Sequence, residues 1–243
     1  MERARDGVNV DVFQKCFDFK DADAVRDSGV YPYFRMIASG QDPVVTMNGQ
    51  RVIMLGSNNY LGLTNHPEIK AAAASALESY GTGTAGSRFL NGTLEIHVEL
   101  EEKLAQFMRR ESALTFSTGF QVNLGVIASL VQRKDVVILD NLDHACILDG
   151  ARLSFGRVLK YPHNDMDALE ERLRSVEEDR SAMIVVDGVF SMEGDLVNLP
   201  EVVRLAKRHG ANVMVDDAHG LGVFGDNGRG TAEHFGLEND VDL

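Results

Sequence analysis

From about residue 112 onward, short apolar runs alternate with amphipathic segments along the chain. The apolar runs predict buried strands at Ala113–Phe116, Val136–Leu139, Val158–Tyr161, Ala182–Val186 and Val213–Val215. The amphipathic segments predict helices at about 122–132, 145–154, 165–178 and 200–209. Alternation of this kind is typical of an α/β domain with a mostly parallel sheet and helices on both of its faces.

The first part of the chain has a different pattern. Residues 1–40 are polar and mixed, which predicts an arm with a short helix. Val44–Leu55 alternates around Asn48-Gly49, a hairpin signal because both turn residues tolerate positive φ. Two helices are predicted next, an Ala-rich one at Pro67–Tyr80 and an amphipathic one at Leu94–Met108. We expect an N-terminal arm and β-hairpin at 1–55 and a large domain at 56–243.

Charge and composition narrow the possible partners. The formal net charge is −13, from 24 basic and 37 acidic residues, and such a surface repels nucleic acid and anionic lipid. No run approaches the ~20 apolar residues needed to span a bilayer, and Met1–Val12 has no apolar core of a secretory signal. Cys16 and Cys146 have neither disulfide nor metal-ligand spacing. We expect a cytoplasmic protein without a metal site, nucleic-acid partner or stable membrane insertion.

Two glycine patterns match the dinucleotide-binding spacing G-x-G-x-x-G. Gly81–Gly86 follows a predicted helix rather than a strand. Gly220–Gly225 follows a strand, but Asp216–His219 intervenes and no helix follows. Because the motif acts only between a strand and a helix, a nicotinamide-dependent oxidoreductase is a disfavoured alternative.

Polar residues follow four of the predicted strands, at the edge where ligands bind in open α/β sheets. Asp216 and Asp217 point to opposite faces of their strand, and a carboxylate buried there needs a cationic partner. Thr118 and Gly119 open a helix and offer a phosphate site, although helix capping by Ser117 or Thr118 is the simpler interpretation. The four segments are Ser117–Asn123, Asp140–Cys146, Asp187–Asp195 and Asp216–Gly220.

From about Val44 to Leu243 the sequence resembles the α-oxoamine synthases, a branch of the fold type I enzymes that use pyridoxal 5'-phosphate (PLP). The motifs that carry the resemblance are Ser57–Leu63, Gly86–Thr93, Thr118–Phe120, Asp143–Ala145, Asp187–Asp195 and Val215–Gly220. The resemblance implies the PLP-binding large domain of that fold and a decarboxylating condensation of an amino acid with an acyl-CoA. The motifs look most like those of the bacterial members that join serine to palmitoyl-CoA to give 3-oxosphinganine.

The resemblance also implies a role for each site residue. Asp216 pairs with the pyridinium nitrogen of PLP, which keeps the ring an electron sink. His144 stacks on the ring, while His219 and Ser191 hydrogen-bond its phenolic oxygen. Asn58 lies where the family contacts the substrate carboxylate. The implied catalytic residues are His144, His219 and Asp216, and the implied cofactor-binding residues are Thr118, Gly119, Phe120, His144, Ser191, Asp216 and His219.

The chain departs from the family pattern near its end. The family's Schiff-base lysine follows the strand that Val241–Leu243 would begin, but Lys207 is the last lysine printed. We therefore expect a fragment without the C-terminal small domain, inactive alone, whose intact form is a homodimer. The alternatives are another α-oxoamine synthase (8-amino-7-oxononanoate synthase or glycine C-acetyltransferase) and a non-catalytic subunit without the lysine.

Overall fold

The computed structural model describes residues 11–243. The first ten residues of the predicted arm lie outside this range. The chain forms two compact units, one reaching to Ser57 together with Thr64–His66, the other made of Asn58–Leu63 and Pro67–Leu243. The predicted domain boundary after residue 55 remains a prediction.

The first unit holds two short helices and a hairpin. The helices are α1 (Gln14–Asp18) and α2 (Asp21–Asp27). Strands β1 (Val44–Met47) and β2 (Gln50–Ile53) pair antiparallel. Their turn residues Asn48 and Gly49 have φ of 51° and 76°, the left-handed region that the Asn-Gly signal predicted.

A parallel four-stranded sheet forms the centre of the second unit. Its order is β4-β3-β5-β6, and every neighbouring pair is parallel. All four strands fall on predicted apolar runs, and β3 is buried along its whole length. The strands are β3 (Val136–Asp140), β4 (Arg157–Tyr161), β5 (Ala182–Asp187) and β6 (Asn212–Asp216).

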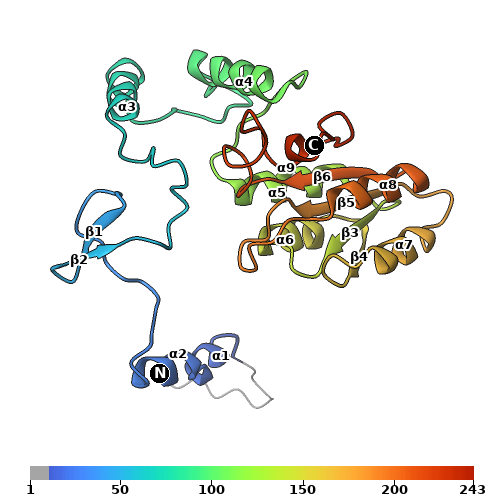
Figure 1. Ribbon diagram of the computed structural model, residues 1–243, viewed down its shortest axis with the longest axis horizontal. Helices are drawn as coiled ribbons and strands as arrows, with labels where there is room; N and C mark the ends of the chain where they lie inside the picture. Colours follow the sequence, from blue (N-terminus) through green and yellow to red (C-terminus); the bar gives the residue numbers. More distant parts are fainter. Residues whose placement is uncertain (1–10) are drawn as a thin grey trace, which may run out of the picture. The chain divides into compact units, whose positions relative to one another are not determined.

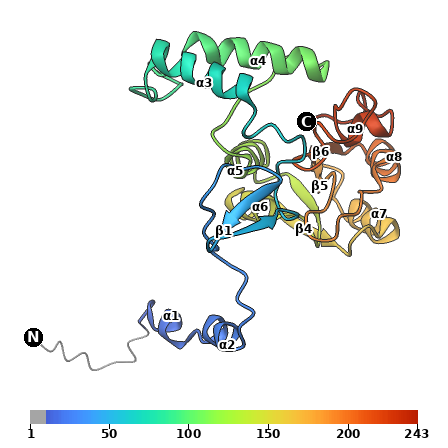
Figure 2. The same cartoon turned by 60° about the vertical axis from the view of Figure 1, so that its left-hand side comes forward.

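Helices cover both faces of this sheet, as the alternating pattern predicted (Figures 1 and 2). Alternate strand residues face opposite ways, so Val137 and Leu139 join one buried cluster and Val136 and Ile138 join the other. On the first face lie α5 (Gly119–Leu130) and α6 (Ala145–Leu153). On the second face lie α7 (Met166–Arg174) and α8 (Leu199–His209).

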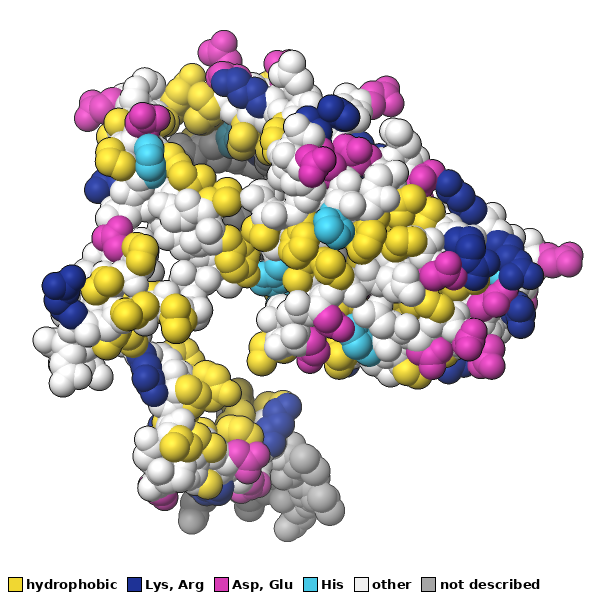
Figure 3. Space-filling view, viewed as in Figure 1, with side chains coloured by type: hydrophobic (Ala, Val, Ile, Leu, Met, Phe, Trp, Pro, Cys, Tyr) yellow, Lys and Arg dark blue, Asp and Glu magenta, His cyan; other side chains and the backbone are white. Residues whose placement is uncertain are grey.

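Three more helices belong to the second unit. They are α3 (Pro67–Tyr80), α4 (Glu95–Met108) and α9 (Thr231–His234). Helix α3 buries none of its residues and α4 buries only Ala105. Between them, Phe89 and Leu90 are 93% and 80% exposed, and many hydrophobic side chains lie on the face drawn in Figure 3. Within residues 11–243, no helix is long and apolar enough to cross a bilayer.

One predicted strand, Ala113–Phe116, was wrong. This run belongs to no β-ladder. Ala113 and Leu114 line an apolar cavity together with Leu243 and Met214 of β6. Leu243 accepts a hydrogen bond from Val215 N–H at 3.1 Å and so bonds to the edge of β6 itself. An apolar run makes a strand only where a partner strand offers free backbone groups.

The run Val241–Leu243, predicted as the start of another strand, does reach the sheet. Asp242 N–H donates to the carbonyl of Val213 at 2.9 Å, and Val241 is 4% exposed. Asp242 also accepts a hydrogen bond from Val213 N–H through its side chain at 2.8 Å. The end of the chain is therefore held against β6.

Gly150 allows α6 to lie against α5. A Cβ placed on Gly150 would come within 2.7 Å of the Asn123 carbonyl oxygen, which is backbone and cannot swing away. We expect Gly150→Ala to cost about 1–3 kcal/mol of stability by forcing the helices apart. Thermal unfolding should show this as a midpoint lowered by about 2–4 °C per kcal/mol. Gly83→Ala, where the added Cβ meets open space, is the control, and equal midpoints for the two variants would contradict the expectation.

Candidate active site

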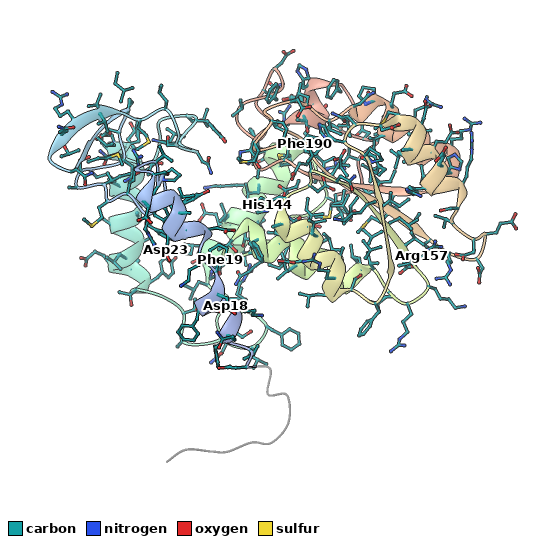
Figure 4. All side chains as sticks on the ribbon, turned by 90° about the horizontal axis from the view of Figure 1, so that it is seen from below. Asp18, Phe19, Asp23, His144, Arg157 and Phe190 are labelled. Carbon is teal, nitrogen blue, oxygen red and sulfur yellow. The ribbon has the colours of Figure 1, made fainter. Side chains whose placement is uncertain are left out.

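The carboxyl ends of the parallel strands meet at one edge of the sheet. Asp140, Asp187 and Asp216 are the last residues of β3, β5 and β6. Helix α6 begins at the same edge, directly after His144. Figure 4 shows His144 and Phe190 near this edge, whereas Arg157, the first residue of β4, lies at the opposite end. Ligands of open α/β sheets bind at the carboxyl edge, so this is the candidate site.

Asp216 and Asp217 point to opposite sides of β6. Asp216 Oδ2 accepts a hydrogen bond from Asn123 Nδ2 on α5 at 2.6 Å, and Oδ1 accepts from Ala218 N–H at 3.1 Å. Asp217 instead accepts from the backbone N–H and the hydroxyl of Thr231, at 2.7 and 3.0 Å. Only Asp216 therefore faces the side on which α5 and α6 lie.

His144 caps α6. Its Nδ1 accepts a hydrogen bond from Cys146 N–H at 3.2 Å, and its own backbone N–H donates to Asp187 Oδ2 at 2.9 Å. His144 is therefore the N-cap residue of α6. The ring is nevertheless exposed, so its face remains open to a ligand at the sheet edge.

Thr118 caps α5 in the same way. Its hydroxyl oxygen accepts from Gln121 N–H at 3.1 Å. Gly119 begins the helix, and a Cβ placed on it would meet nothing within 4 Å. Phe120 is 44% exposed. Open space therefore adjoins Gly119 at the positive end of the helix, and proteins bind phosphate at helix ends of this kind.

A tyrosine brings His219 and Asn58 together. The Tyr60 hydroxyl lies 2.6 Å from His219 Nδ1 and 3.4 Å from Asn58 Oδ1. Tyr60 is separated from His219 by 159 residues along the chain. Asn58 and His219, to which the resemblance assigns different tasks, therefore both contact the Tyr60 hydroxyl.

Ser191 lies exposed on the loop that follows β5. Phe190 beside it is fully buried, and its ring packs edge-on against His163 at 4.3 Å between centroids. His163 lies 2.9 Å from Asp195 and 3.1 Å from Asp140, which fixes the loop to β3. Burial lowers the pKa of His163, but the hydrogen bonds to these two carboxylates outweigh burial and raise the pKa overall.

Buried carboxylates surround the base of the site. Asp143 accepts from the backbone N–H groups of Asp187 and Asp140 at 3.0 and 2.8 Å. Burial, followed by the charges of these two residues, raises the pKa of Asp143 well above its usual value. Burial and the charge of Asp216 raise the pKa of Asp187 to about 7. The site therefore disfavours further negative charge and favours a cation.

The proposed residues do not all touch one another. Within the described part of the chain, Ser191 and Thr118 make no hydrogen bond to Asp216, His144 or His219. The structure joins Asn58 to His219 through Tyr60 and places Asp216 and His144 on either side of Asn123 and Cys146.

In a comparison with protein families, residues 50–243 match the Aminotransferase class I and II model. The chain belongs to the aminotransferase class I and II family. Serine palmitoyltransferase of Sphingobacterium spiritivorum is 56% identical over 225 residues, 93% of this chain and 56% of that protein. The 8-amino-7-oxononanoate synthase of Geobacter sulfurreducens is 50% identical over 219 residues, 90% of this chain and 56% of that protein.

Solved structures agree with these relatives. A serine palmitoyltransferase variant from S. paucimobilis, described with a bound PLP–myriocin aldimine, superposes with a TM-score of 0.92 at 39% identity. The superposition covers 96% of this chain and 59% of the serine palmitoyltransferase chain. The resemblance to α-oxoamine synthases and the α/β fold of the PLP-binding large domain are thus confirmed. The chain spans little more than half the length of the relatives that it matches.

Three residues at the site were not predicted from the sequence. Tyr60 lay inside the Ser57–Leu63 motif but received no role. Asn123 and Cys146 lay next to assigned residues, and each is only 3% exposed. The available signal was a polar residue within an apolar helix, since Asn123 interrupts Val122–Leu130 and Asn is a weak helix former.

Proposed function

We propose that this chain is the PLP-binding part of an acyl-CoA:amino acid C-acyltransferase. The observation that carries the proposal is Asp216, a half-buried carboxylate at the carboxyl end of β6 that Asn123 holds at 2.6 Å. Such a carboxylate requires a cation, and a protonated pyridine nitrogen is one. The relatives named serine palmitoyltransferase supply the reaction class.

The residues at the sheet edge fit PLP. Gly119 begins α5 at its positive end and borders open space, which suits a phosphate. The exposed His144 ring suits stacking. We assign Thr118, Gly119 and Phe120 to the phosphate, His144 to the ring face, and Ser191 and His219 to the phenolic oxygen. Asn58 would bind the substrate carboxylate.

In the proposed reaction, bound PLP supplies an electron sink for the carbanion at the amino-acid α-carbon. Asp216 would hold the pyridine nitrogen in its protonated form, and His144 would orient the ring. The α-carbon would lose its proton and form a bond to the acyl carbon while the thioester C–S bond breaks, and the departing sulfur would take up a proton. Coenzyme A leaves as the thiol, CO₂ leaves from the amino acid, and a proton takes its place. With L-serine and palmitoyl-CoA the product is 3-oxosphinganine.

The relatives also suggest a second candidate within the same chemistry, 8-amino-7-oxononanoate synthase, because members with that name are up to 50% identical. The exposed Phe89, Leu90 and the outer faces of α3 and α4 support homodimer formation by the intact protein. We also propose that the 243-residue chain does not turn over alone, since its last lysine, Lys207, lies on α8 in an ion pair with Asp240. A cytoplasmic location is part of the same proposal.

The test begins with the coding sequence beyond codon 243. The protein that it encodes should be produced with PLP and assayed for release of the coenzyme A thiol. We expect release to depend on both L-serine and palmitoyl-CoA, with CO₂ formed in equal amount. Release with alanine or glycine in place of serine would support another α-oxoamine synthase. If the reading frame stops at Leu243 and the protein neither binds PLP nor turns over, the enzyme proposal fails and the non-catalytic subunit is favoured.

A further inference from the structure

We propose that Asn123 and Cys146 are positioning residues, which form a hydrogen-bonded relay that fixes Asp216 and His144 relative to each other. The inference rests on the proposed function, because it concerns two residues of the proposed cofactor site. Neither Asn123 nor Cys146 belongs to the set of site residues that the resemblance implies.

The amide of Asn123 joins two elements of the site. Its Nδ2 lies 2.6 Å from Asp216 Oδ2 on β6 and 3.1 Å from Cys146 Sγ on α6. An amide nitrogen carries two protons, so each contact uses one of them. The side chain is only 3% exposed, and water therefore does not compete for either hydrogen bond.

The thiol of Cys146 continues the relay to His144. Its Sγ lies 2.8 Å from His144 Nδ1. Burial, together with the charges of Asp216 and Asp187, raises the pKa of the Cys146 thiol. The thiol therefore keeps its proton at neutral pH and donates it toward the imidazole.

The helix cap and the relay both place the proton of His144 on the same nitrogen. Nδ1 already accepts from Cys146 N–H at 3.2 Å, and a nitrogen that accepts from two donors carries no proton of its own. The proton of a neutral His144 ring is therefore on Nε2. All donors in the sequence Asn123, Cys146, His144 point the same way, which strengthens each bond.

Close helix packing makes the relay possible. Gly150 of α6 lies against the Asn123 carbonyl, where even a Cβ would clash at 2.7 Å. One helical turn before Gly150, this approach brings Cys146 to the Asn123 side chain. An orientation fixed before binding costs no rearrangement when the cofactor arrives.

A simpler explanation is that Asn123 and Cys146 only fill buried space, with the hydrogen bonds of the Asn123 amide satisfied. Two features favour the relay instead. The next buried residue on the same face of α5 is the aliphatic Ile127. A structural role at position 123 would therefore be served by an aliphatic side chain, without the cost of burying an amide. Both N–H bonds of Asn123 also go to residues of the site, rather than to nearby backbone.

The test uses the purified chain with Asn123→Leu, Cys146→Ala and Cys146→Ser, and with Ile127→Val as a packing control one turn away on α5. Nitrogen-15 NMR of labelled histidines in the cofactor-free chain reports the hydrogen bonds that His144 Nδ1 accepts. We expect a Nδ1 resonance shifted by two accepted hydrogen bonds in the unsubstituted chain and in Cys146→Ser, whose hydroxyl replaces the thiol donor. In Cys146→Ala only the backbone N–H of residue 146 remains as a donor, so the resonance should move toward that of a nitrogen with one accepted bond.

Equilibrium dialysis with PLP gives the second measurement. Loss of one buried, charge-assisted hydrogen bond in Asn123→Leu should weaken PLP binding about tenfold, while Ile127→Val leaves it unchanged. The relay is overturned if Cys146→Ala leaves the His144 Nδ1 resonance unaltered and Asn123→Leu binds PLP as the unsubstituted chain does. If the protein encoded past codon 243 also fails to bind PLP, the proposed function fails, and the Nδ1 measurement still decides the relay.

Discussion

Replacing Asp216 with asparagine is expected to weaken PLP binding by about 100-fold. The substitution removes the negative charge that would pair with the pyridinium nitrogen, and its single oxygen can keep only one of the hydrogen bonds that Asp216 accepts from Asn123 and Ala218. Loss of the other hydrogen bond should lower the stability of the cofactor-free chain by about 1–3 kcal/mol. Equilibrium dialysis and thermal unfolding of the same preparations measure the two effects.

Asp217→Asn is the matched control, one residue away on the other side of β6. Its carboxylate accepts two hydrogen bonds from Thr231, and an amide can accept only at its one oxygen. We expect a loss of about 1–3 kcal/mol of stability with PLP affinity unchanged. Equal losses of affinity in the two variants would show that Asp216 has no special relation to the cofactor.

Lowering the pH from 7 to 5 is expected to stabilise the cofactor-free chain, with a contribution of about 2 kcal/mol from Asp187. The pKa of this carboxyl is about 7 in the folded chain, against 3.8 as its usual value. Between these values the folded chain holds a proton that the unfolded chain has lost, so stability falls as the pH rises through this window. The raised pKa values of Asp143, Asp217 and His163 act in the same direction.

Asp187→Asn isolates the contribution of this residue. The amide oxygen still accepts from His144 N–H, but the side chain no longer ionises. The variant should therefore be more stable than the unsubstituted chain at pH 8 and should gain less on acidification. Thermal midpoints across pH 5–8 measure this, with the exposed Asp179→Asn as control. Parallel pH curves for Asp187→Asn and the unsubstituted chain would contradict the assigned pKa.

The fold was predictable from local pattern. The spacing of the apolar positions located β3, β5, α6 and α8 to within one or two residues. Each of these elements has a buried face, and the spacing of its apolar residues shows which residues lie on that face. Helix α7 was predicted too long because its pattern continues past Arg174. Ala113–Phe116 failed for a different reason, since a strand also needs a hydrogen-bonding neighbour and the local pattern does not report one.

The sequence by itself determined where the site lies. Parallel strands end at one edge, so the residues following β3, β5 and β6 had to meet there, and the family motifs assigned Asp216 and His144 to it. Only the tertiary structure decided how these residues are connected. Tyr60 reaches His219 across 159 positions, and Asn123 reaches Asp216 across 93. The pKa of Asp187 depends on how deeply the packed sheet and helices bury its carboxyl group. Neither this burial nor contacts between residues far apart in the chain can be read from neighbouring residues.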